Sequence, residues 1–441
     1  MSILTLLVVF FGLIVVGAPI AVALGGSVIV SSLIFSPIPL AIVGQKVLAN
    51  LDHVTLMAVP FFFFAAALME TGGLVQRLIR LANALVGHWR GGLGLTSVGS
   101  CTLFAAISGS SPATVAAIGR ILYPSLVREG YTPAYAIGAL VTAGSIGILI
   151  PPSIPMIIYG FVTETSVIRL FLAGVIPGLL YATGLMLMAR WLARGQQPIH
   201  STRPSAGERW AIVREALPSL SLPVFLLVGI YGLPAFNWGG LAYEGGAIFT
   251  PTEAAIMGCL LAFVVGKWVY RELSVRSALQ AVIRTAPSVG MIFFIATNAL
   301  LFAYFITKMG LPQAVTQLLL DLKLSKEAFL MIVNVLLTIV GFFLEGVPTI
   351  LMFVPVIFPA AMALGVDPVH LGIIIILNIE LGLVTPPVGL NLFVGSSISG
   401  QPVGQVFKAA LPWMSVTLVM LLLVTYIPSL SLYLPNLLMP G

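Results

Sequence analysis

The chain has 441 residues, of which 59% are hydrophobic and only 8% are charged, and its formal net charge is +6. Soluble proteins typically carry about 25% charged residues, so this composition excludes a soluble globular fold and predicts a polytopic membrane protein. The basic residues gather in a few loops, where they orient the chain in the membrane, and they do not indicate nucleic-acid binding. Cys101 and Cys259 lie in apolar stretches and form neither a disulfide framework nor a metal-binding spacing.

Apolar stretches recur along the whole chain, and a membrane-spanning helix needs about 20 such residues. They predict ten to twelve spans and an all-α fold. The stretches lie near 3–34, 54–71, 93–108, 134–150, 168–192, 217–234, 246–266, 286–307, 328–344, 350–364, 369–384 and 405–430. Segments 74–88 and 270–284 carry arginines among apolar residues at helical spacing. They fit either helices lying along the membrane surface or span ends whose arginines extend to the interface.

Glycine, serine and proline interrupt the apolar pattern at two similar places. Ser108–Thr114 is followed by Gly147–Pro152, and Glu345–Thr349 is followed by Gly382–Pro387. The second set follows the first by 235 residues (349 minus 114), and many other glycines and prolines repeat at the same offset. The chain therefore contains an internal repeat.

The distribution of charge predicts that the repeats are inverted. Basic residues gather in 190–215 and 267–284, whereas the equivalent segments of the other repeat carry almost none. Basic loops lie in the cytoplasm, so equivalent segments face opposite sides of the membrane. The predicted organisation begins with N-terminal scaffold spans (1–50) and a first repeat (51–195), which has a re-entrant hairpin near 93–128 and a broken helix near 134–160. A cytoplasmic loop and two linking spans follow (196–266), with an external loop at 235–250. The second repeat (267–430) has a hairpin near 328–364 and a broken helix near 369–396, and a C-terminal tail (431–441) ends the chain.

Inverted repeats with helices broken at mid-membrane are typical of secondary transporters. Irregular backbone survives in a membrane only where it lines a cavity or meets a ligand, and the freed carbonyl and hydroxyl oxygens are hard ligands that suit Na⁺. Two pseudo-symmetric Na⁺ sites are therefore predicted, the first at Ser108, Ser111, Gly147, Ile150 and Pro152, the second at Gly346, Thr349, Gly382 and Thr385. The alternative explanation is that small residues pack helices together and prolines kink them.

A substrate site is predicted between the same two breaks. Helices that begin near Pro112 and Pro348 would direct positive partial charge at it, which favours a carboxylate. The candidate substrate-binding residues are Ser110, Ser111, Pro112, Thr114, Pro152, Glu345, Pro348, Thr349 and Pro387. No catalytic signature is found, so we do not expect an enzyme.

Three carboxylates, Glu70, Glu345 and Glu380, fall within apolar stretches. Such residues are expected to be functional or to be paired. They are predicted to pair with Arg120 or a lysine, to stabilise the hairpin backbone, or to couple protons. Asp52–His53 is expected at a span end, and His370 at a helix start in a capping or interface role.

Residues 369–394, with Asn378–Val394 as the most specific part, resemble the DctM-like large membrane subunit (M subunit) of tripartite ATP-independent periplasmic (TRAP) transporters, as do 108–119 and 143–153. The resemblance implies an elevator-type architecture of the ion-transporter superfamily. It implies Na⁺-driven uptake of an organic acid, such as a C4-dicarboxylate, sialic acid or a related sugar acid, across the bacterial cytoplasmic (inner) membrane. It also implies two partners, a separate small four-helix membrane subunit and a periplasmic substrate-binding protein.

Three other classes remain alternatives. Stand-alone divalent-anion/Na⁺ symporters share hairpins and inverted repeats but typically carry Ser-Asn-Thr motifs at both hairpin tips. Here the tips read Ser108-Gly-Ser-Ser-Pro112 and Glu345-Gly-Val-Pro-Thr349. A channel would have the same composition, although two occluding hairpins favour alternating access. An intramembrane enzyme has the least support, since no acid–base or nucleophile arrangement is visible.

Overall fold

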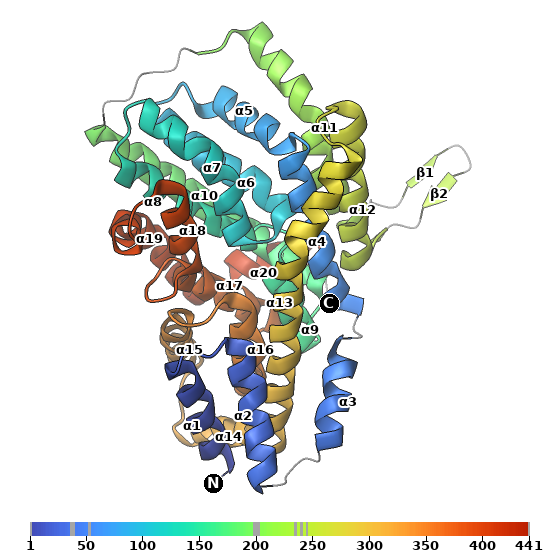
Figure 1. Cartoon of the computed structure of the whole chain (residues 1–441), viewed down its shortest axis with the longest axis vertical. Helices are drawn as coiled ribbons and strands as arrows, with labels where there is room; N and C mark the ends of the chain where they lie inside the picture. The colour runs from blue at the N-terminus through green and yellow to red at the C-terminus, as the bar shows by residue number, and fades with distance from the viewer. Residues whose placement is uncertain are drawn as a thin grey trace.

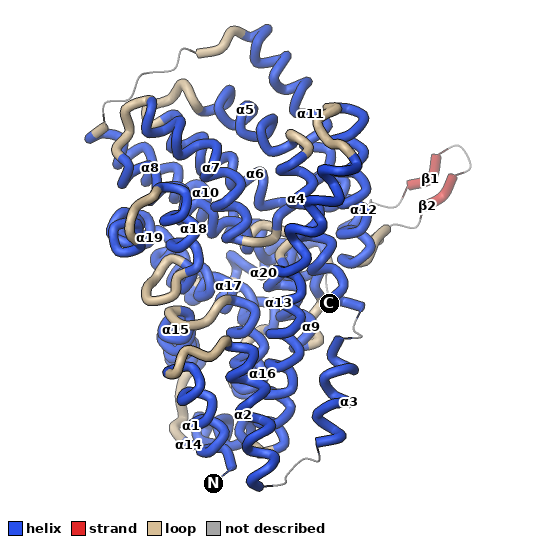
Figure 2. The backbone as a smooth tube through the Cα atoms, in the orientation of Figure 1, coloured by secondary structure: helices blue, strands red, loops and turns tan. Residues whose placement is uncertain are grey.

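The computed structural model describes residues 2–35, 40–51, 54–196, 203–232, 236–238, 241–243 and 246–439. These residues are almost entirely helical (Figure 2). The α-helices are α1 (Ser2–Val15), α2 (Ile20–Phe35), α3 (Leu40–Leu51), α4 (Ala58–Thr71), α5 (Leu74–Val86), α6 (Gly92–Ser108), α7 (Ser111–Arg128), α8 (Pro133–Ala143), α9 (Ile154–Thr163), α10 (Val167–Leu192), α11 (Ala206–Tyr231), α12 (Pro251–Val264), α13 (Val275–Lys308), α14 (Leu311–Asp321), α15 (Lys326–Gly341), α16 (Gly346–Ala363), α17 (Pro368–Leu383), α18 (Leu390–Ser399), α19 (Val403–Tyr426) and α20 (Ser429–Leu438). Shorter turns are η1 (Val54–Met57), η2 (Gly144–Ile148), η3 (Ala193–Gly195) and the π-helical η4 (Val265–Val269).

Six helices of the described chain are long and apolar enough to cross a membrane by themselves. The bent pair α4 and α5, which turns by 71°, would add a seventh. Several predicted spans are instead helices of 10–17 residues. At 1.5 Å per residue, these reach at most about 26 Å, short of the ~30 Å hydrocarbon core. The stretch 3–34 is one example, because Pro19 and Gly17 separate α1 from α2.

The two arginine-bearing segments differ in structure. Segment 74–88 largely forms a separate helix, α5, whereas most of 270–284 is the first part of α13, a continuous helix of 34 residues. The surface-helix interpretation is therefore wrong for the second segment. Arg77 on α5 forms ion pairs with Glu215 on α11 (3.2 Å) and with Glu272 (2.6 Å), and its guanidinium lies over the Tyr270 ring. These contacts fix α5 against the basic end of the linking helices.

Two helical hairpins lie in opposite halves of the molecule (Figure 1). The first, α6–α7, lies in the upper half of the view, and the second, α15–α16, lies in the lower half. The long helix α13 packs on α16 of the second hairpin and on α4. The turn of each hairpin is short, residues 109–110 in the first and 342–345 in the second. The turns therefore face the middle of the molecule from opposite ends.

Each hairpin is followed by a helix that breaks and restarts. In the first case α8 tightens into the 3₁₀ turn η2 and restarts as α9, whose first turn is capped by Ser153. In the second, α17 ends at Leu383 and restarts as α18 at Leu390. A Pro-Pro pair lies in each break, and proline cannot donate the backbone hydrogen bond that a continuing helix requires. The two interruptions thus coincide with the Pro-Pro motifs.

The two halves of the chain interlock. Helix α18 packs on α7 and α8, and α19 packs on α8. The buried Tyr181 hydroxyl of α10 is 2.8 Å from the Thr417 hydroxyl of α19. Apolar packing and a hydrogen bond therefore join the first half of the chain to α18 and α19 of the second half.

The remaining segments differ in detail from the expectations. The 235–250 loop, which is predicted to be external, contains a small antiparallel hairpin of β1 (Phe236–Trp238) and β2 (Leu241–Tyr243), an exception to the all-α prediction. The expected tail is largely helix α20, which packs on α10. Asp52–His53 lie outside the described residues.

Candidate functional site

The turns of the two hairpins meet at a small cavity of about 30 Å³. Ser110, Ser111 and Pro112 line it from the first turn, and Glu345 and Gly346 line it from the second. Helices α4 and α13 close it with apolar side chains. The structure therefore brings together, from opposite ends of the molecule, the two tips that the sequence singled out.

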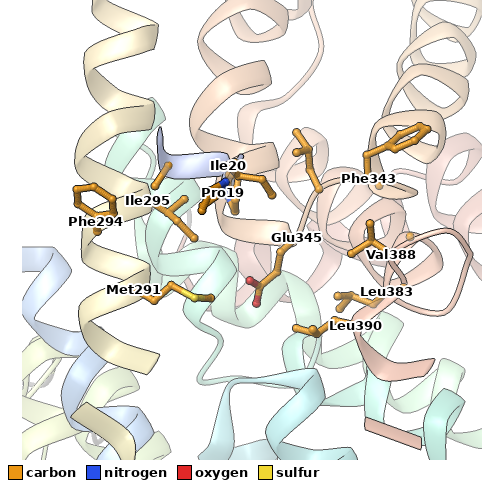
Figure 3. A pocket seen from close by; sticks show the side chains of 16 residues that line it. Pro19, Ile20, Met291, Phe294, Ile295, Phe343, Glu345, Leu383, Val388 and Leu390 are labelled. Carbon is orange, nitrogen blue, oxygen red and sulfur yellow. The ribbon is translucent and has the colours of Figure 1, made fainter. Parts of the chain in front are cut away.

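A larger cavity of about 250 Å³ adjoins the second tip. Pro348 and Gly382 line it, together with Met291 and Phe294 of α13 and Ile20 of α2. Glu345 is the only charged residue among its lining residues, and its carboxyl group points into the space (Figure 3). Because Glu345 lines both cavities, it marks where they adjoin.

Oxygen atoms converge at the first tip. The buried Ser108 and Thr114 hydroxyls lie 2.7 Å apart, and the Thr114 hydroxyl donates to the Ser110 carbonyl oxygen at 2.9 Å. Gly147 of η2 lies directly against them, since a Cβ added there would be 2.7 Å from the Thr114 hydroxyl oxygen and 2.9 Å from the Ser110 carbonyl oxygen. Three of the predicted residues, Ser108, Thr114 and Gly147, therefore lie together.

Ser111 belongs to a different group of contacts. Its hydroxyl accepts a hydrogen bond from Asn391 Nδ2 (2.8 Å) at the start of α18. The same nitrogen also lies 3.1 Å from the Val141 carbonyl oxygen and 3.4 Å from the Ser145 hydroxyl. Asn391 is fully buried and joins the first tip to the second broken helix. The sequence analysis did not single it out, although an asparagine four positions after Pro387 in an apolar segment is a usable signal.

At the second tip the predicted side chains bond within their own helices. The Thr349 hydroxyl donates to the Glu345 carbonyl oxygen (2.8 Å), as the Thr114 hydroxyl, 235 positions earlier (349 minus 114), does to the Ser110 carbonyl oxygen. The Thr385 hydroxyl donates to the Leu381 carbonyl oxygen (2.7 Å). Gly382 packs against α15, where an added Cβ would lie 2.8 Å from the Gly341 Cα.

The other predicted residues lie in or next to the helix breaks and the second hairpin turn. The Pro152 carbonyl oxygen lies close to Gly109, which in turn accepts a hydrogen bond from the Ile154 nitrogen at 3.2 Å. Ile150 packs against Gly178 of α10. Gly346 packs against Ile379 of α17. Pro387 lies between α17 and α18, next to Val388, whose nitrogen donates to the Phe342 carbonyl oxygen (3.0 Å).

The three carboxylates have different surroundings. Glu70 pairs with Arg120 at 3.4 Å on an exposed surface, as predicted for one of the three. Glu345 and Glu380 form no ion pair with any described residue. The buried His370 Nδ1 lies 2.8 Å from the Ser431 hydroxyl of α20, which fits the predicted interface role. Asp367, and not His370, caps α17 with its side chain.

Comparison with known proteins identifies the family of this chain. The family model described as "Tripartite ATP-independent periplasmic transporter, DctM component" matches residues 7–430. The chain belongs to this family. It is therefore a multi-pass membrane protein and a large permease component of a TRAP transporter, which confirms the resemblance seen in the motifs at both breaks.

Relatives of this DctM component carry different substrate names. It is 46% identical to the C4-dicarboxylate TRAP transporter large permease protein DctM of Pseudomonas aeruginosa, over 94% of each chain. It is 39% identical to the Rhodobacter capsulatus protein of the same name, over 99% of this chain and all of that one. The sialic acid TRAP transporter large permease protein SiaM of Vibrio cholerae is 31% identical over 97% of each chain.

Two solved transporter structures share the fold. The YdaH transporter of Alcanivorax borkumensis aligns with a TM-score of 0.61 and 16% identity, over 88% of each chain. MtrF of Neisseria gonorrhoeae aligns with a TM-score of 0.61 and 14% identity, over 88% of this chain and 83% of that one. At this level of identity the likeness concerns the fold alone.

Proposed function

We propose that this DctM component carries out Na⁺-driven uptake of an organic acid across the bacterial cytoplasmic (inner) membrane. The observation that carries the proposal is the meeting of two hairpin tips at a cavity in a member of the TRAP family. The substrate class is a C4-dicarboxylate, sialic acid or a related sugar acid, in line with the names of its relatives. A small four-helix membrane subunit and a periplasmic substrate-binding protein complete the transporter.

The first tip fits a sodium ion. The Ser108 and Thr114 hydroxyls and the Ser110 carbonyl group are hard oxygen ligands within one small volume. Gly147 lets the backbone of the break approach them, since its lack of a Cβ leaves the needed space. At the second tip we assign the equivalent role to Gly346, Thr349, Gly382 and Thr385.

The substrate site lies between the tips in this proposal. Helix α7 begins at Ser111 and α16 begins at Gly346, so both helix N-termini, with their unpaired N–H groups, adjoin the small cavity. Such N-termini favour a carboxylate. Apolar residues of α2 and α13 would cover the rest of the solute in the larger cavity.

Alternating access follows an elevator mechanism in this proposal. The hairpins α6–α7 and α15–α16, together with the two broken helices, form the mobile domain, and α1–α4 and α11–α13 belong to the scaffold. The repeats at 51–195 and 267–430 are inverted, which is supported by hairpins that enter from opposite ends of the molecule (Figure 1). The membrane potential adds about 2.3 kcal/mol per translocated charge per 100 mV.

The test is solute uptake into proteoliposomes that contain this chain and its small subunit. An inward Na⁺ gradient is applied with and without the cognate binding protein, over a panel of C4-dicarboxylates and sugar acids. We expect uptake only when both the gradient and the binding protein are present. Uptake that needs Na⁺ but not the binding protein would instead support a stand-alone symporter, and uptake without a gradient requirement would support a channel.

Alanine at Ser108 or at Thr385 is expected to weaken sodium activation of uptake. Each substitution removes one hydroxyl, worth about 1–2 kcal/mol, so the half-saturating Na⁺ concentration should rise about tenfold. Ser415→Ala is the matched control, because its hydroxyl donates to the backbone of its own helix on an exposed face. Unchanged sodium activation in both variants would contradict the site assignment.

A further inference from the structure

Glu380 is a fully buried carboxylic acid with no hydrogen-bond or ion-pair partner among the described residues. It lies one turn before the end of α17 and is 0% exposed. Neither of its oxygen atoms has a hydrogen-bond partner within 3.5 Å among the described residues, and none of their ion pairs includes it. Burying an ionised carboxylate in this way is strongly unfavourable unless a positive charge compensates it.

Among the residues that the structure describes, none pairs a positive charge with Glu380. Its carboxyl group faces the Ser145 hydroxyl and the backbone of Ile148 in η2, and Tyr181 of α10 is a nearby titratable group. Ser145 is the repeat mate of Glu380, 235 positions earlier (380 minus 145). The carboxyl group also lies near the C-terminus of α17, where the helix dipole contributes further negative potential. The ionised form of this carboxyl group would be stabilised by a nearby cation, which the described side chains do not provide.

Glu380 lies between the two sets of proposed sodium ligands. Gly382 of the second set follows it by two residues on the same chain. Gly147 of the first set belongs to η2, the turn that the carboxyl group faces. Asn391 connects Ser145 of this turn to Ser111 through hydrogen bonds from a single nitrogen. The carboxyl group thus faces the first break and belongs to the helix that ends at the second.

We propose that Glu380 is the shared counter-charge of the two sodium sites. The inference rests on the proposed Na⁺ coupling and adds a residue that is not itself a ligand. A fixed negative charge in the low-dielectric core attracts a cation at either break, and bound Na⁺ compensates the buried charge in turn. This role accounts for an intramembrane carboxylate that has no basic partner.

The experiment measures binding of ²²Na⁺ to the purified full-length chain with its small subunit. Glu380→Gln keeps the shape and removes the charge, and we expect the Kd for Na⁺ to rise at least about tenfold, equivalent to ~1.4 kcal/mol. Moving the charge to the repeat mate, in Glu380→Gln with Ser145→Asp, should restore the Kd to within about threefold of the unmodified protein. Glu70→Gln, on the exposed Arg120 pair, should leave sodium binding unchanged.

Equal Na⁺ affinity in Glu380→Gln and the unmodified protein overturns the proposal, because glutamine mimics a neutral acid. If Glu380→Gln cannot be purified as a folded protein, the test uses the double variant Glu380→Gln with Ser145→Asp. A folded double variant that binds no Na⁺ also overturns the proposal. Failure of the unmodified protein to bind ²²Na⁺ is a different result, since it rejects the sodium coupling of the proposed function itself.

Discussion

Replacing Gly147 by alanine is expected to lower sodium-driven uptake by about 100-fold or more. The added Cβ would lie 2.7 Å from the Thr114 hydroxyl oxygen and 2.9 Å from the Ser110 carbonyl oxygen. Real Cβ atoms are not found so close to such atoms, so the hairpin tip or η2 must move away. Displacing reacting or binding groups by about 1 Å can lower a rate by about 100-fold.

The matched control is Gly404→Ala, because a Cβ at that glycine of α19 meets nothing within 4 Å. Uptake is measured in proteoliposomes at equal reconstituted protein, with the melting temperature of each variant recorded in detergent. We expect Gly404→Ala to transport normally and Gly147→Ala to remain folded but inactive. Normal uptake by Gly147→Ala would show that the tip and the break need not touch during transport.

Replacing Asn391 by leucine is expected to destabilise the protein by about 3 kcal/mol and to abolish uptake. The Asn391 amide donates to the Ser111 hydroxyl and to the Val141 carbonyl oxygen inside the protein. Leucine has a similar volume but no donor, so two buried oxygen atoms lose a partner, at about 1–3 kcal/mol each. The first tip would also lose its only hydrogen bond to α18 among those that the described residues form.

Thermal unfolding in detergent and uptake at matched protein amount measure the two effects. Asn436→Leu is the control, since Asn436 is exposed and its side chain accepts a single bond from Arg169 at 2.9 Å. It should change stability by less than about 0.5 kcal/mol. An Asn391→Leu protein as stable as this control would mean that Ser111 and Val141 find other donors, and would remove Asn391 from the site.

Features that depend only on composition or on residues close together in the sequence could be predicted from the sequence. The scarcity of charged residues identified a membrane protein, because no soluble surface of this size can be built from 8% charged residues. The Pro-Pro pairs placed both helix breaks, since proline lacks the N–H that the next turn requires. The contact between Thr114 and Ser110 is also local, one helical turn apart. The constant offset of glycines and prolines also predicted an internal repeat.

Helix boundaries were less predictable where apolar runs are continuous. The stretch 3–34 contains two helices, and α13 extends through a segment that also fitted a surface helix. In a membrane protein both the lipid-facing and the core-facing sides of a helix are apolar, so hydrophobic periodicity carries little information about which face is buried. Hydropathy therefore finds apolar segments but does not decide where each helix turns.

By itself, the sequence determined the membrane class, the two breaks, the hydroxyl groups at the first tip and the family motifs. Only the tertiary structure decided which distant groups meet. Asn391 contacts Ser111 across 280 residues of chain, and Glu345 shares a cavity with Met291 and Ile20. The physical reason is the distance along the sequence over which each interaction acts. Backbone geometry and capping depend on residues within a few positions, whereas contacts between helices depend on how all their apolar faces pack at once.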